Sequence, residues 1–227
     1  MPTLIGTNLI NRASTLLQDQ TNVRWTRTEL LDWLNDGQRV IVQLLPESFA
    51  VVSAVTASTN GQTQFAIPSD GIRLIDVLYN TAGQNTAVRQ IDRSVLDTQY
   101  PTWRTSTPAA ECRHFSFDKR TPKVFFLYPP LTSGSGVEIA YSASPTPLSA
   151  ESSTITLDDV FATALVDFIV YRAYLKDAEY AANDRKSQGA YETFVGSLTG
   201  MKAANLSTEP DEAVVISGVR HSNAARG

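Results

Sequence analysis

The chain has 227 residues, which is enough for one domain or for one domain and a smaller second one. With 42% hydrophobic and 19% charged residues, its composition excludes a disordered chain and is typical of a protein that buries a core. A formal net charge of −4 argues against tight, general binding to DNA, which requires a basic surface.

Residues 1–48 are predicted to form a helical hairpin. The second helix is expected to begin at Thr26, which stands three residues before Glu29 in a capping-box pattern, and to end before Pro46. The first helix is indicated over residues 4–20 by apolar residues at helical spacing, namely Ile5, Leu9, Ala13, Leu16 and Leu17. The face of the second helix is formed by Leu30, Trp33, Leu34, Gly37, Ile41 and Leu44.

Residues 49–145 are predicted to form an inserted, antiparallel β-rich region. Residues 49–57 are rich in β-favouring side chains, and Asn60-Gly61 is typical of a tight hairpin turn with 62–68 as the return strand. A short helix is expected within 91–101. Further strands are expected at 72–80, 87–91, 113–118, 123–128 and 137–141. This order of elements argues against a parallel, nucleotide-binding sheet.

Residues 153–205 are predicted to form two helices that complete the bundle; one kinked helix is the alternative. The first is expected to start at Thr156, with Asp158 and Asp159 near the positive end of its dipole. Its face is lined by Phe161, Leu165, Phe168, Tyr171 and Leu175, and that of the second by Tyr191, Phe194, Val195, Leu198 and Met201. The predicted bundle core consists of Leu30, Trp33, Leu34, Ile41, Phe161, Leu165, Phe168, Tyr191 and Phe194.

The expected fold class is therefore α+β: an antiparallel helical bundle built from both ends of the chain, with an inserted β-rich region. Residues 206–227 are predicted to be an extended docking tail. They contain a short β-prone block among polar and small residues, and such a segment buries too little surface to fold without a partner.

The sequence contains no motif that indicates catalysis or a bound cofactor. His114 and His221 lack metal-ligand spacing, and no P-loop, nucleophile elbow or dinucleotide fingerprint is found. The carboxylates of Asp158 and Asp159 could serve acid–base chemistry, but helix capping explains both. Cys112 is the single cysteine, so we expect a small buried hydrophobe, with no disulfide and no cysteine-based zinc site. We predict a protein that is not an enzyme and has no cofactor or metal.

Aromatic and basic residues alternate between positions 100 and 128. They could form a stacking platform for nucleic acid, although a half-buried sheet predicts the same pattern. The aromatic members are Tyr100, Trp103, Phe115, Phe117, Phe125, Phe126 and Tyr128, and the basic ones are Arg104, Arg113, Arg120 and Lys123.

No apolar run is long enough to span a membrane, because Asp167 and Arg172 interrupt the most apolar segment. The first residues, MPTLIGTNLINRAS, lack the features of a secretory signal. We therefore expect an intracellular protein with no membrane partner.

Several strings occur in the order of a known family. ELLDWLNDGQ lies in the N-terminal hairpin, VFFLYPP and EIAYSASP end the β-rich region, and TITLDDVFATALVDFIVYRAYLKDAEYAANDRKSQGAYETFVGSL follows. This arrangement resembles the head-to-tail adaptor (connector) proteins of tailed bacteriophages, in particular the podovirus-like neck adaptors. The resemblance covers nearly the whole chain.

The resemblance implies a virion structural protein made in the host cytoplasm and located in the neck. Such proteins form a ring of about twelve identical copies, which fits closed rotational symmetry. The ring lies beneath the portal protein, carries tail or nozzle proteins, and lets DNA pass through its channel without sequence-specific binding. A C-terminal extension docks on the portal. In this chain its contacts would be Val214, Val215, Ile216, Val219 and Arg220.

Two alternatives remain open at the level of sequence. One is another phage tail protein or head-completion protein. The other is a protein that binds or degrades polysaccharide or the cell wall; degradation would require a carboxylate pair in a cleft or a metal.

Overall fold

In the computed structural model, residues 2–177, 179 and 181–208 are described, and the chain divides into two compact units. The helical unit comprises the chain up to Leu45 and from Pro147 onward. The β unit comprises Pro46–Thr146. The predicted boundaries, after residues 48 and 145, lie a few residues from these. The fold class is α+β, as predicted.

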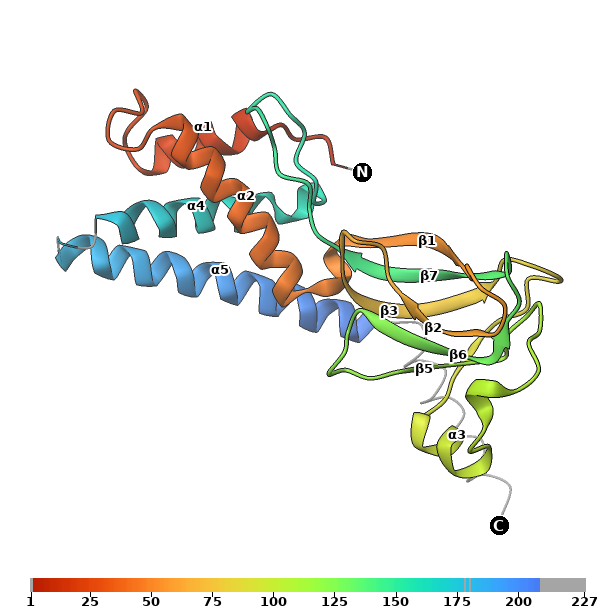
Figure 1. The fold of residues 1–227 in the computed structure, drawn as a ribbon. Helices are drawn as coiled ribbons and strands as arrows, with labels where there is room; N and C mark the ends of the chain where they lie inside the picture. Colours follow the sequence, from red (N-terminus) through yellow and green to blue (C-terminus); the bar gives the residue numbers. More distant parts are fainter. Residues whose placement is uncertain (1, 178, 180, 209–227) are drawn as a thin grey trace, which may run out of the picture. The chain divides into compact units, whose positions relative to one another are not determined.

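The helical unit contains four α-helices in the part of the chain that is described. They are α1 (Gly6–Leu16), α2 (Arg27–Leu44), α4 (Ala162–Lys176) and α5 (Ala181–Thr208), with the 3₁₀ turn η3 (Asp159–Phe161) before α4. The α4 helix packs against each of the other three, and α5 runs back alongside it (Figure 1). Two separate helices after residue 153 confirm the preferred prediction over one kinked helix.

Local signals set the ends of α2. The Thr26 hydroxyl accepts a hydrogen bond from the Glu29 backbone N–H, and the Glu29 carboxylate accepts one from the Thr26 backbone N–H, as the capping-box pattern predicts. The helix ends at Leu44, two residues before Pro46.

Most of the predicted bundle core is buried. Seven of its residues have exposed fractions of 8% or less: Leu30, Leu34, Ile41, Phe161, Leu165, Phe168 and Phe194. Trp33 is only half-buried. Tyr191 is 45% exposed, which corrects its assignment to the core. Its ring lies at the margin of the α4–α5 contact, against Tyr171 at a centroid distance of 5.0 Å.

Other details of the predicted helical faces are wrong at helix ends. Leu16, Leu44 and Leu175 are 57%, 47% and 40% exposed, because each lies in the last turn of its helix. The segment after residue 153 does not become helical at Thr156. Its first turn begins at Asp159, and Asp158 is the N-cap, accepting a hydrogen bond from the Val160 N–H at 3.2 Å.

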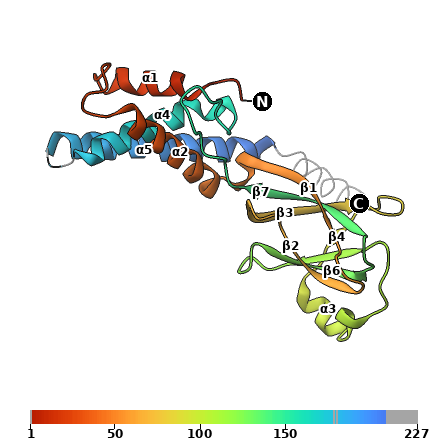
Figure 2. The same cartoon turned by 45° about the horizontal axis from the view of Figure 1, so that its top comes forward.

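The β unit consists of two sheets that enclose one core. The strand order of the first sheet is β1 (Ala50–Thr56), β7 (Gly136–Ala143) and β3 (Gly71–Asn80). That of the second is β2 (Gln62–Ala66), β6 (Val124–Leu131), β5 (His114–Phe117) and β4 (Arg89–Gln90). The second view, in Figure 2, separates the labelled strands of the two sheets. Phe65 and Phe125 stack at 5.8 Å within the shared core.

The predicted hairpin across Asn60-Gly61 is not formed. Gly61 does adopt a positive φ of 81°, but its N–H bonds to Leu131 O, so the chain crosses from one sheet into the other. Consequently β1 pairs with β7, and β2 pairs with β6. The expectation of a fully antiparallel region also needs correction, because the two-residue β4 pairs in parallel with β5.

A short helical layer follows β4. It consists of α3 (Arg93–Gln99) and η2 (Trp103–Thr105), where a short helix was predicted. Trp103, which is 1% exposed, packs edge-on against Phe126 of β6 at 6.1 Å. This layer therefore covers part of the face of the second sheet that points away from the inter-sheet core.

Candidate assembly surfaces

The residues predicted to dock on the portal, Val214, Val215, Ile216, Val219 and Arg220, lie outside the described residues.

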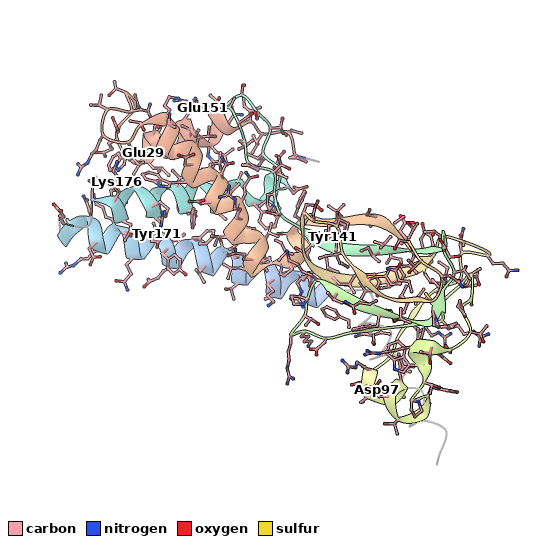
Figure 3. All side chains as sticks on the ribbon, viewed as in Figure 1. Glu29, Asp97, Tyr141, Glu151, Tyr171 and Lys176 are labelled. Atoms are coloured by element: carbon pink, nitrogen blue, oxygen red, sulfur yellow. The ribbon has the colours of Figure 1, made fainter. Side chains whose placement is uncertain are left out.

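A row of aromatic side chains connects the interior of the helical unit to its surface. Phe168 and Phe194 are buried, and their ring centroids lie 5.2 Å apart. Phe168 also contacts Tyr171 at 5.7 Å, and Tyr171 contacts the exposed Tyr191. Figure 3 labels Tyr171 between α4 and α5. Because the row ends in an exposed ring, it presents apolar and hydroxyl surface on the flank of the α4–α5 pair.

The side of α5 that faces away from α4 is lined by small residues. Gly189, Gly196 and Gly200 are exposed, and a Cβ at any of them would have no neighbouring atom within 4 Å. Their spacing places them on one face, opposite the buried Phe194 and Leu198. This glycine face, defined by the three glycines, would let another helix approach closely.

The start of α2 and the end of α4 are joined by a hydrogen bond, an aromatic contact and an ion pair. The Trp25 indole Nε1 donates to Ala173 O at 3.1 Å, and its ring meets Tyr174 edge-on at 6.2 Å. Lys176 Nζ lies 2.5 Å from Glu29 Oε1; Figure 3 labels both residues. The hydrogen bond from Lys176 is the main reason that the pKa of Glu29 is lowered. Trp25 was not predicted to lie in the core, because it stands just outside the apolar pattern of α2.

The N-terminal residues are bound by the segment before α4. The Asp159 carboxylate accepts hydrogen bonds from Thr3 Oγ1 and from the N–H groups of Thr3 and Leu4, at 2.5 to 3.1 Å. These bonds, led by that of the Thr3 hydroxyl, lower the pKa of Asp159. Asp159 thus acts as an anchor for the N-terminus and not as the predicted cap.

The same segment also contacts α2, because Arg27 forms a two-pronged ion pair with Glu151.

The aromatic side chains that could have formed a nucleic-acid platform are largely used in packing. Phe115, Phe117 and Phe125 belong to or pack against the inter-sheet core. On the other face of the sheet, Tyr128 stacks with Tyr100 at 5.8 Å. These contacts favour the half-buried sheet over a nucleic-acid platform.

Asp97 and Arg104 hold the helical layer of the β unit. The Trp103 indole Nε1 donates to Asp97 Oδ1 at 2.8 Å, and this bond is the main reason that the pKa of Asp97 is lowered. The Arg104 guanidinium lies 5.0 Å from the Trp103 ring centroid and 5.2 Å from that of Phe126. Asp97 is labelled in Figure 3.

A basic pocket opens beside β4 and β5. It has a volume of about 600 Å³ and is lined by residues 90–93, residues 116–120 and Phe126. Arg93, Lys119 and Arg120 supply positive charge. In the sequence, Arg120 stands out only as part of the pattern of aromatic and basic residues. The pocket itself was not predicted, because its walls come from segments brought together by the parallel β4–β5 pair.

Cys112 is a buried thiol, as its sequence context predicted. It is 1% exposed, and its Sγ lies 3.2 Å from Asn80 Oδ1. Burial raises the pKa of the Cys112 thiol to about 12. Within the described residues, no group of three or more His, Cys, Asp or Glu side chains is arranged to hold a metal ion. None of the described helices has the length and apolar character needed to cross a bilayer.

The comparison with protein families gives a match over most of the chain. The model of the SU10 adaptor protein family matches residues 6–213, which cover the β unit and most of the helical unit. No match is found among curated proteins. The chain therefore belongs to the SU10 adaptor protein family, and it is a structural adaptor protein of a bacteriophage.

Proposed function

We propose that this protein forms a closed ring in the neck of the virion, where it connects the portal protein to tail or nozzle proteins and lets DNA pass. The observation that carries the proposal is the family match over residues 6–213. The order of elements in podovirus-like neck adaptors supports the same position in the virion. About twelve copies is the stoichiometry that this resemblance favours.

A closed ring needs two different surfaces on each copy, one that meets the next copy and one that meets the previous copy. The glycine face of α5 is suited to one of them. It is exposed and unobstructed in the single chain, and the exposed Tyr191 lies elsewhere on the same helix. We assign it to contact with a neighbouring copy.

The C-terminal tail is assigned to the portal. Val214, Val215, Ile216 and Val219 would supply apolar anchors, and Arg220 a polar one. Such a segment would become ordered when it docks, which makes assembly dependent on the portal.

The protein's charge suits a DNA channel. A net charge of −4 gives an average repulsion toward phosphates. DNA would then slide through the ring without sequence-specific binding.

The test is native mass spectrometry of the purified protein, alone and mixed with the portal protein encoded near its gene. We expect a fixed, ring-sized number of copies on each portal. A folded protein that does not bind a folded portal would contradict the proposal.

A matched pair of variants tests the glycine face. Gly196→Leu should leave the single chain folded, because no atom lies near that Cβ, but should prevent the full ring from forming. Gln188→Leu adds a similar apolar side chain on another exposed part of α5 and should still form rings. Full rings with Gly196→Leu would remove this face from the ring contact.

A further inference from the structure

The basic pocket of the β unit contains a buried hydroxyl group that has no hydrogen-bond partner. Ser116 is 1% exposed, and its Oγ forms no hydrogen bond. Its neighbours Phe115 and Phe117 point into the inter-sheet core, so the alternation of a strand directs Ser116 to the opposite face, where it lines the pocket. A buried hydroxyl without a partner is unfavourable, and a ligand that accepts its proton would remove that cost.

The charges around this hydroxyl favour an anion. Lys119 and Arg120 form no salt bridge within the part of the chain that the structure describes. The Asp92 carboxylate caps α3 by accepting the Ser94 N–H at 2.8 Å, and Asp118 accepts the Arg120 N–H at 2.9 Å. Both acids remain charged, but each is directed to a backbone donor, whereas the Lys119 and Arg120 side chains have no salt-bridge partner among the described residues and can each donate to an added carboxylate.

The walls of the pocket favour an acidic group on a peptide over a bare ion. Phe126, which lies on the same face of the sheet as Ser116, contributes aromatic surface beside the charged side chains. A volume of about 600 Å³ is within the range of sites that hold a ligand of several residues or a small molecule. The site therefore fits an acidic group carried on a peptide better than a bare ion.

We propose that this pocket binds the acidic segment at residues 209–212 of a second copy of the chain, with a carboxylate accepting hydrogen bonds from Ser116 and from Lys119 or Arg120. Three of the four residues in that segment are acidic: Glu209, Asp211 and Glu212. They directly follow Thr208, the last described residue of α5.

The assignment to a second copy rests on the proposed ring. A head-to-tail ring requires each copy to donate one surface and to accept another, and a tail segment with a pocket in the β unit forms such a pair. The apolar residues from Val214 onward would remain available for the portal. The contact would be strongest at low ionic strength, since the charges lie at the surface.

The first experiment measures binding of a labelled peptide, LSTEPDEA, which reproduces residues 206–213. The receptor is the full chain with Glu209→Gln, Asp211→Asn and Glu212→Gln, so that its own segment does not compete. We expect binding that weakens with salt and that is lost with the neutral peptide LSTQPNQA. Equal binding of both peptides, or of neither, would overturn the proposal.

Receptor variants then locate the site. Lys119→Gln combined with Arg120→Gln should weaken binding roughly tenfold or more, because charged hydrogen bonds are the stronger ones. Lys123→Gln, which removes a cation three positions further along the chain that does not line the pocket, is the control. Unchanged binding by the double variant would overturn the proposal.

Ser116→Ala should weaken peptide binding without lowering the melting temperature, because the hydroxyl has no partner in the free protein. Ser142→Ala removes another buried, unpartnered hydroxyl, in β7, and should leave binding unchanged. A Ser116→Ala variant that binds as tightly as the receptor would remove the hydroxyl from the site.

Mixing two full-length variants distinguishes a neighbour's segment from the chain's own. One variant has the neutral segment with an intact pocket, and the other has Lys119→Gln and Arg120→Gln with an intact segment. We expect the two to associate with each other, and each alone to remain monomeric. Absence of association in the mixture, although the peptide binds, would show that the pocket does not join two copies.

Failure of this inference can be told apart from failure of the proposed function. If the pocket variant still forms complete rings on the portal, the pocket is not a ring contact and the adaptor function stands. If the wild-type protein does not bind the portal at all while the peptide still binds the pocket, the proposed function fails.

Discussion

At the scale of single residues, Gly37 sets how closely α2 can approach α4. A Cβ at this position would lie 3.0 Å from Phe168 Cδ1 and 3.3 Å from Leu165 Cδ2. Gly37→Leu should therefore overpack a closely fitted contact and lower the free energy of unfolding by about 1–3 kcal/mol. Chemical denaturation of the purified variant measures this change.

Gly189 provides the matched control, because a Cβ there meets nothing. Gly189→Ala should raise the free energy of unfolding by up to about 1 kcal/mol, since alanine favours the helix over glycine. If Gly37→Leu proved as stable as the wild type, the close contact with Phe168 would be refuted.

Asp159 should make stability depend on pH in the acid range. Its pKa is lowered from its usual 3.8, so its contribution is present above that value and is lost as pH falls through the lower, folded-state pKa. Asp159→Asn should flatten this acid dependence. Denaturant midpoints measured from about pH 5 downward test it, with Asp32→Asn as a control on the exposed side of α2.

An acid profile that is the same for wild type and Asp159→Asn would show that the N-terminal anchor contributes nothing to folding. The sequence could indicate that Asp159 interacts with backbone donors, because it stands at a helix start. It could not identify Thr3 and Leu4 as those donors, since they lie more than 150 positions away.

At the scale of elements, the contact between the start of α2 and the end of α4 combines the buried ring of Trp25 with ion pairs at the surface. Trp25 is 4% exposed, whereas the Lys176 and Glu29 side chains are 46% and 35% exposed. Partly exposed ion pairs contribute about 0–1 kcal/mol, while truncating a buried tryptophan costs about 3–5 kcal/mol. The ring, not the ion pair, should determine how firmly these elements are joined.

We therefore expect Trp25→Ala to lower the melting temperature strongly and Lys176→Met to leave it nearly unchanged. Thermal unfolding followed by circular dichroism at 222 nm compares the two. Trp25→Phe should be intermediate, because it keeps most of the apolar surface but loses the hydrogen bond to Ala173 O. A larger loss from Lys176→Met than from Trp25→Ala would reverse this ranking.

Helices could be predicted from the sequence better than strand pairing. Capping and helical spacing are local signals, so α2 follows from them, whereas two helices after residue 153 were only preferred over one kinked helix. The partners of β1 and β2 depend on contacts between distant residues, such as the bond from Gly61 N–H to Leu131 O. The Asn60-Gly61 pattern therefore predicted a turn at the right place but the wrong pairing.

At the scale of the whole molecule, the β unit is an insertion whose two ends meet. Ala50, near its start, pairs with Ser142, near its end. Expression of residues 46–146 alone should therefore give a folded domain, with a dispersed amide NMR spectrum and a cooperative melt. A spectrum typical of an unfolded chain would show that the β unit needs the helical unit to fold.

The candidate sites, like the strand pairing, could be predicted only where they consist of one continuous segment. The sequence pattern predicted an apolar face within residues 191–201 and a docking tail at residues 206–227, because both are continuous segments, and the docking stays a prediction. The basic pocket joins residues around positions 92 and 118 through a two-residue parallel strand. Strands were predicted at 87–91 and 113–118, but no local pattern indicates their parallel pairing, so neither the pocket nor the unpaired hydroxyl of Ser116 could be found without the structure.

The meeting of both insertion ends at β1 and β7 has a mechanical consequence. The chain enters the β unit at Leu45–Pro46 and leaves it at Thr146–Pro147. Both connections lie at the same end of the strand pair, beside the start of β1 and the end of β7. Tension from the helical unit would therefore pull two adjacent strand ends in one direction. It would neither stretch the β unit from end to end nor peel β1 from β7, so a load borne by one unit need not unravel the other.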